Sequence, residues 1–125
     1  MLPDVVSAIE EIRANFPTSS ITSSEDGEGG AYVILEDVPI PPGYSVDRSW
    51  IGFRITYSYP AADVYPHFVR PDLARVDGKA LALSPSTFNG RPALQLSRRS
   101  THWDPAHDTA ALKLQKILTW MEDPS

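Results

Sequence analysis

Cysteine is absent from this chain of 125 residues, and its absence excludes several classes of chemistry. Disulfide bonds, zinc–thiolate sites, iron–sulfur clusters and thiol catalysis all require cysteine. The chain also lacks the run of about 18 consecutive apolar residues that a membrane span needs, so we expect no membrane protein. Its first residues, MLPDVVSAIEEIR, have neither the basic start nor the uninterrupted apolar core of a secretory signal. We therefore expect a cytoplasmic protein of bacterial type.

Positive charge is scarce in the first part of the chain. The net charge is −5, from 11 basic and 16 acidic residues, which argues against a nucleic-acid partner. Residues 1–47 contain nine acids and one base, whereas residues 48–125 contain seven acids and ten bases. This asymmetry is typical of a solvated acidic face. Alternatively, two faces of opposite potential meet different proteins.

The length and the 42% hydrophobic content predict one domain over residues 1–125. No internal repeat is present. Apolar residues at Val5, Ile9, Ile12 and Phe16 follow the period of a helix. Pro17 makes continuation of that helix past Phe16 unfavourable, because proline lacks the N–H that a helix needs.

Segments of strand character follow this first helix. The sequence predicts strands at 31–38, 49–57 and 93–97, a short edge strand at 67–69 and another short strand around Ile21. In the second of these, Ile51, Phe53, Ile55 and Tyr57 alternate with other residues and form one apolar face. Residues 74–92 read as an irregular excursion.

A second helix closes the chain. Asp104 is a candidate N-cap, Pro105 suits the first helical position, and Asp108 adds negative charge to the first turn. The expected buried stripe consists of Ala110, Leu114, Ile117, Leu118 and Met121. Because the strands are grouped between helices, the fold class is α+β with the helices on one face of an antiparallel sheet.

The densest group of functional side chains is LSRRSTHWDPAHD, residues 96–108. Serine, histidine and aspartate together suggest a hydrolase triad, but proximity in sequence does not establish triad geometry, and the GxSxG motif is absent. His102, His107 and Asp108 include metal-ligand types, yet the aspartates have ordinary helix-start roles, so we expect no metal. Arg98 and Arg99 suit either a solvated loop or recognition of a carboxylate. A tryptophan before a capped helix, Trp103, is typically a core residue.

Several short motifs, taken together, resemble the ubiquitin-conjugating enzyme fold over nearly the full length. They are Tyr59-Pro60 followed by Pro66 and Phe68, and the Trp103-Asp104-Pro105 helix start. The strings PPGY (41–44), SWIGFRITYSYP (49–60) and SRRSTHW (97–103) resemble a prokaryotic branch of that superfamily. The resemblance implies an N-terminal helix, a four-stranded antiparallel meander, an irregular active-site-like segment and a C-terminal helix.

The chain departs from this family at the nucleophile. Ubiquitin-conjugating enzymes hold their modifier as a thioester on cysteine, and this chain has none. The family spacing counted back from Trp103 places Gln95 at the nucleophile position, whereas counting forward from Asn89 places Ser97 there. The local string STFNG (86–90) also replaces the HPN tripeptide. Transthiolation by this chain is therefore excluded on chemical grounds.

Three hypotheses remain from the resemblance. In the first, a non-catalytic component binds a ubiquitin-like modifier, its activating enzyme or both, in a bacterial conjugation pathway of the kind linked to antiphage defence. In the second, Ser97 carries the modifier as an oxyester, with His102 as base and Asn89 or a backbone N–H as oxyanion donor; Ser100 and Thr101 are weaker candidates. In the third, the fold is an interaction module unrelated to modifiers. No hypothesis requires a cofactor.

The resemblance also implies where partners bind. We expect the modifier at the loop from Ser97 to Trp103, with Gln95, Arg98, Arg99 and Ser100 as its contact residues. We expect the activating enzyme at the first helix, whose charged residues are Asp4, Glu10, Glu11 and Arg13.

Overall fold

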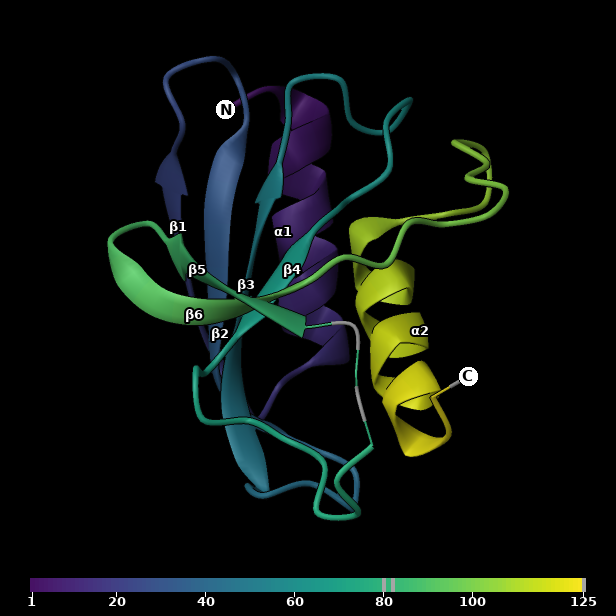
Figure 1. Cartoon of the computed structure of the whole chain (residues 1–125). Helices are drawn as coiled ribbons and strands as arrows, with labels where there is room; N and C mark the ends of the chain where they lie inside the picture. Colours follow the sequence, from purple (N-terminus) through teal and green to yellow (C-terminus); the bar gives the residue numbers. More distant parts are fainter. Residues whose placement is uncertain (80, 82, 125) are drawn as a thin grey trace.

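The computed structural model describes residues 1–79, 81 and 83–124. Within these residues the chain forms two α-helices and six β-strands, which confirms the α+β class (Figure 1). In chain order the elements are α1 (Pro3–Asn15), β1 (Ser20–Glu25), β2 (Ala31–Pro39), β3 (Arg48–Ile55), β4 (His67–Val69), β5 (Leu83–Phe88), β6 (Arg91–Leu96) and α2 (Ala110–Glu122). Neither helix in the described part of the chain is long and apolar enough to cross a membrane.

The six strands form one antiparallel sheet in the order β1-β2-β3-β4-β6-β5. Strands β1 to β4 form the expected four-stranded meander, and a hairpin of β5 and β6 extends it. The expectation that residues 67–69 form an edge strand is wrong. His67 pairs with Phe53 on one side and with Leu96 on the other, so β4 lies inside the sheet.

The hairpin also corrects the expectation of an irregular excursion over residues 74–92, of which positions 80 and 82 lie outside the described residues. β5 has an irregular, mostly exposed burial pattern, because it lies at the sheet edge. A strand edge tolerates Pro85, which cannot donate a ladder hydrogen bond. Asn89 and Gly90 both have positive φ angles, of 50° and 83°. An Asn-Gly pair of this kind supplies the turn that a two-residue hairpin needs.

Both helices cover one face of the sheet, and the hairpin crosses the opposite face (Figure 1). The core between helices and sheet contains Val5, Ile9, Ile12, Val33, Leu35, Ile51, Phe53, Ile55, Leu114, Ile117 and Met121. The expected stripes are confirmed except at Phe16 and Leu118, which are only partly buried, and Phe16 follows the end of α1. The apolar face of β3 is shorter than expected, because the chain turns after Ile55 and leaves Tyr57 58% exposed.

Candidate functional site

The segment that joins β6 to α2 carries most of the predicted site residues. It contains no helix before Ala110, so the expected helix start at Asp104 and Pro105 is wrong. Asp108 accepts a hydrogen bond from the backbone N–H of Asp104 at 2.8 Å and closes a separate turn. The actual N-cap is Thr109, whose side chain accepts from the N–H of Leu112 at 3.1 Å. A short side chain with a free oxygen is the preferred cap at this position.

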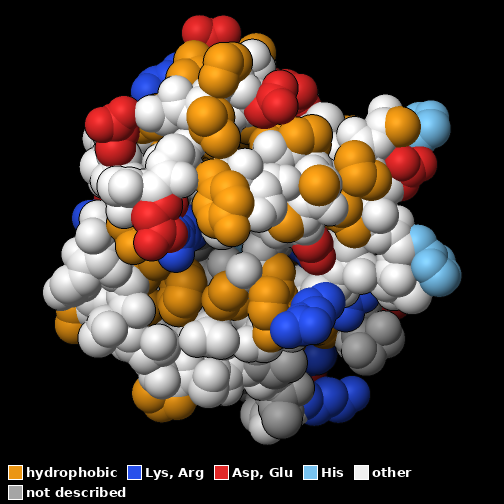
Figure 2. All heavy atoms as spheres, turned by 90° about the horizontal axis from the view of Figure 1, so that it is seen from above, with side chains coloured by type: hydrophobic (Ala, Val, Ile, Leu, Met, Phe, Trp, Pro, Cys, Tyr) orange, Lys and Arg blue, Asp and Glu red, His pale blue; other side chains and the backbone are white. Residues whose placement is uncertain are grey.

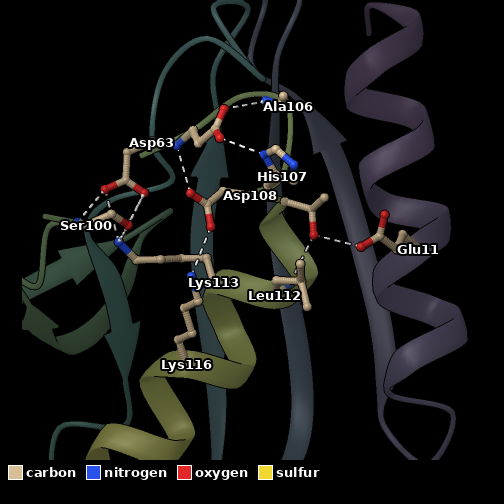
Figure 3. Close-up of polar contacts among 11 residues, drawn as sticks. Glu11, Asp63, Ser100, Ala106, His107, Asp108, Leu112, Lys113 and Lys116 are labelled. Atoms are coloured by element: carbon tan, nitrogen blue, oxygen red, sulfur yellow. Dashed lines mark hydrogen bonds and ion pairs between the residues drawn. The ribbon is translucent and has the colours of Figure 1, made fainter. Parts of the chain in front are cut away.

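Thr109 also connects the two helices. Its hydroxyl donates to a carboxylate oxygen of Glu11 on α1 at 2.7 Å (Figure 3). The same hydroxyl oxygen accepts from α2, so one side chain satisfies a helix terminus and fixes the neighbouring helix. The beginning of α2 is therefore held in place relative to α1.

A buried ion pair anchors the segment to the rest of the fold. The Nζ atom of Lys113 lies 3.0 Å from each carboxylate oxygen of Asp63 and 2.8 Å from the hydroxyl of Ser100. Ser100 in turn donates its N–H and its O–H to Asp63, at 2.8 and 3.1 Å. Figure 3 shows the lysine extending from α2 toward both partners. Burial lowers the pKa of Lys113, and the carboxylate of Asp63 opposes this effect.

A cavity of about 450 Å³ lies between this segment and α2. Its lining residues are Arg98, Arg99, Ser100, Thr101, His102, Asp108, Lys113, Lys116 and Ile117. Figure 2 shows Lys and Arg side chains gathered at one edge of the upper face, while hydrophobic side chains occupy its middle. The structure thus brings four of the predicted site residues, Arg98, Arg99, Ser100 and His102, to the wall of one cavity.

The two arginines of the segment stack on aromatic rings. The guanidinium of Arg98 lies 4.6 Å from the ring centre of Trp120, and that of Arg99 lies 4.8 Å from the ring centre of Tyr65. Neither arginine forms a salt bridge with any described residue. Stacking occupies the face of a guanidinium and leaves N–H groups at its edge for an anion. Arg99 also donates a hydrogen bond to the side chain of Tyr65, which lowers the pKa of that tyrosine.

The remaining lysine of the cavity is paired with a carboxylate. Lys116 donates to Asp108 at 2.9 Å (Figure 3). The pKa of Asp108 is lowered, first by the hydrogen bond from the backbone of Asp104 and then by Lys116. Asp108 therefore stays ionised and fixes the position of Lys116.

The residues of the oxyester hypothesis are not assembled around Ser97. Its hydroxyl is exposed and accepts a hydrogen bond from the amide of Gln95 at 3.0 Å. Asn89 lies in the turn at the opposite end of β6, and a strand of six residues spans roughly 17–20 Å. His102 is exposed and forms no hydrogen bond with Ser97 in the described structure. Strand β6 therefore separates Asn89 from Ser97 in this structure.

Trp103 fixes the other end of the segment. Its indole N–H donates to the carbonyl of Pro60 at 2.7 Å, and its ring packs beside Tyr59. The side chain is half-buried against the core, as expected for a tryptophan before a helix. Ser100 and Trp103 therefore hold the loop between them, while Arg98, Arg99 and His102 stay exposed.

Asp63 and Lys113 were not among the residues predicted from the sequence. Lys113 lies three residues after Ala110 and four before Ile117, on the buried stripe of α2, so its position in the helical period was a usable signal. Asp63 gave no such signal, because it reaches Ser100 across 37 residues of sequence.

His107 and the aspartates of the segment have other contacts in the structure. Among the described residues, no group of three or more histidine, aspartate and glutamate side chains could hold a metal ion. The ring of His107 instead lies 2.6 Å from a carboxylate oxygen of Asp104.

Comparison with known proteins gives one match. A family model described as "Prokaryotic E2 family E" matches residues 15–124. Neither the curated proteins nor the solved structures include a match to the chain.

Proposed function

Because the chain belongs to the Prokaryotic E2 family E, whose members are related to ubiquitin-conjugating enzymes, we propose that it is a binding component of a ubiquitin-like conjugation pathway. It binds a ubiquitin-like modifier, its activating enzyme or both, and it forms no thioester. The observation that carries the proposal is a pair of exposed arginines without an anionic partner among the described residues, on a segment that hydrogen bonds of Ser100 and Trp103 attach to the fold. The absence of cysteine excludes transfer of the modifier through a thioester on this chain.

The modifier's acidic groups are the proposed ligands of Arg98 and Arg99. Each guanidinium is oriented by an aromatic ring, so less side-chain entropy is lost when it binds a carboxylate. The backbone beneath them is fixed by Ser100, through Asp63 and Lys113. A positively charged surface with a fixed backbone fits an acidic protein surface or a C-terminal carboxylate.

Helix α1 supplies the proposed surface for the activating enzyme. Asp4 and Glu10 are exposed on it. Glu11 is engaged by Thr109, and Arg13 donates to the carbonyl of Ile21. The exposed charged side chains of the helix that form no such contact are therefore acidic, opposite in sign to Arg98 and Arg99. Electrostatics can thus distinguish the activating enzyme from the modifier.

Binding of the modifier can be tested by calorimetric titration of the chain with a ubiquitin-like protein encoded beside its gene. Reversing both arginines, Arg98→Glu with Arg99→Glu, should weaken binding by about 1–3 kcal/mol, the range for charge-assisted hydrogen bonds. Arg48→Glu is the matched control, because Arg48 is exposed on β3 and lies outside the cavity. If the wild type and the double variant bound the modifier with equal affinity, the interface would lie elsewhere on the chain. No binding of modifier or activating enzyme would favour an interaction module unrelated to modifiers.

A second candidate function is an oxyester carrier, which the exposure of Ser97 favours. Its hydroxyl oxygen would attack the activated C-terminal carbonyl of the modifier and displace the activating group. Intact mass after incubation with activating enzyme, modifier and ATP would then show a stoichiometric gain that hydroxide removes and thiols leave intact. Ser97→Ala should abolish the gain and Ser100→Ala should preserve it. An adduct that survives Ser97→Ala would remove this residue from consideration.

The proposal extends to bacterial defence against phage, as the resemblance implies. Deleting the gene from its host should raise the number of phage plaques, and a copy with Arg98→Glu and Arg99→Glu should fail to restore protection. Equal plaque counts with and without the gene would contradict the defensive role.

A further inference from the structure

The cavity between the segment and α2 has an excess of positive charge. Four of its lining residues are cationic, namely Arg98, Arg99, Lys113 and Lys116. Asp108 is the one carboxylate among the described lining residues. A cavity of this volume, about 450 Å³, falls in the range of small-molecule pockets.

The two lysines are already neutralised. Lys113 is paired with Asp63, and Lys116 is paired with Asp108, at 3.0 and 2.9 Å. Arg98 and Arg99 have no such partner among the described residues. Arg98 and Arg99 are therefore the cationic lining residues whose charge no carboxylate of the described residues compensates.

Two further residues that line the cavity, Thr101 and His102, have free backbone donors. The backbone N–H groups of Thr101 and His102 meet no acceptor within the described part of the chain. The hydroxyl of Thr101 is exposed there as well. Successive free N–H groups beside cationic side chains are a common feature of sites for anions with several oxygens.

We propose that this cavity binds a small phosphate monoester. A phosphate dianion matches two unpaired guanidiniums, whereas a carboxylate has one negative charge and would leave one of them uncompensated. A phosphate also presents three terminal oxygens, enough for both arginines and for the N–H groups of Thr101 and His102. The volume leaves room for the organic part of the ligand above the phosphate.

This site does not rest on the proposed function, since it needs neither modifier nor activating enzyme. The test is calorimetric titration of the full chain with AMP, inorganic phosphate, adenosine and acetate. Ionic strength is held constant, because exposed charges are screened by salt. AMP should bind most tightly, inorganic phosphate less tightly, and adenosine and acetate at least tenfold more weakly than AMP.

The variant Arg98→Gln with Arg99→Gln should weaken AMP binding at least tenfold, while Arg48→Gln should leave it unchanged. Thermal unfolding without ligand confirms that the variants fold. Equal binding of AMP and adenosine, or of AMP and acetate, would overturn the proposal, and so would AMP binding that the double variant retains. A chain that binds AMP but no modifier would contradict only the proposed function, and the reverse result would contradict only this site.

Discussion

Among single residues, Asp63 and Lys113 have unequal effects on stability when they are removed. Lys113 is 4% exposed, so Asp63→Ala leaves a buried ammonium without its counter-charge. Loss of one partner of a buried pair typically costs about 3–5 kcal/mol. We expect Asp63→Ala to lower the free energy of unfolding by about 3 kcal/mol. Lys113→Met should lower it by less, because the apolar stem still fills its place and Asp63 keeps its hydrogen bonds from Ser100.

Urea unfolding of the two variants and the wild type measures this difference. Arg48→Ala is a suitable control, since its guanidinium is exposed and contacts one backbone carbonyl. If Lys113→Met were the more destabilising of the two, the lysine would contribute through packing and not through its charge.

The cluster of Asp63, Ser100 and Lys113 shows how far single site residues can be predicted from the sequence. The importance of residues 97–103 could be predicted, because arginine, serine, histidine and tryptophan are concentrated in one segment. The partner of that segment could not be predicted. Asp63 lies in a proline-rich turn region whose course depends on the packing of Tyr59 and Trp103, and packing across 40 residues is not visible in local pattern.

Among the structural elements, the start of α2 depends on Thr109. Thr109→Ala removes the cap on Leu112 and the contact with Glu11, so it should lower the free energy of unfolding by about 1–2 kcal/mol. Thr109→Ser keeps the hydroxyl and should have a small effect. Asp104→Ala should also cost less than Thr109→Ala, because Asp104 lies in the preceding turn. Chemical denaturation of the three variants measures the order of their free energies of unfolding. A larger decrease for Asp104→Ala than for Thr109→Ala would support the helix start expected from the sequence.

The β5–β6 hairpin depends on a glycine of β3. A Cβ atom at position 52 would lie 2.6–2.7 Å from ring atoms of Phe88, which is closer than packed side chains allow. Gly52→Ala should therefore lower the free energy of unfolding by about 1–3 kcal/mol, as overpacking does. In the Phe88→Ala background the same change should cost much less. A double-mutant cycle by urea unfolding measures the coupling. Equal costs in both backgrounds would mean that the ring moves aside freely.

Strand β5 of this hairpin was not predicted, whereas β6 corresponds to the strand expected at 93–97. The Asn89-Gly90 turn is a strong local signal, but β5 has an edge-strand pattern with a proline and no apolar alternation. Helices and central strands were predictable because burial imposes a period on them. An edge strand is half exposed, so its sequence carries little period.

For the whole molecule, the arrangement of helices on one face was predictable from the grouping of strands between two amphipathic segments. The strand order was not. Strand β4 lies between β3 and β6 because it pairs with both. It has only three residues with little pattern of their own, so this double pairing could not be predicted from the sequence. The same position of β4 buries the side chain of His67.

His67 makes folding sensitive to acid. Its ring packs on Phe53, its two nitrogens have no hydrogen-bond partner among the described residues, and burial lowers its pKa from 6.5 to about 3. The charge of Lys113 contributes to this lowering of the pKa, and Asp63 opposes it. Because the unfolded chain binds the proton more readily, the free energy of unfolding is highest above pH 6.5 and falls by about 1.4 kcal/mol per pH unit between pH 6.5 and 3.

The variant His67→Leu lacks the group that binds this proton, whereas His102 and His107 are present in both the variant and the wild type. From pH 7.5 to pH 5, the wild type should therefore lose about 2 kcal/mol more free energy of unfolding than the variant. Equal losses would show that the buried ring is not the group that protonates.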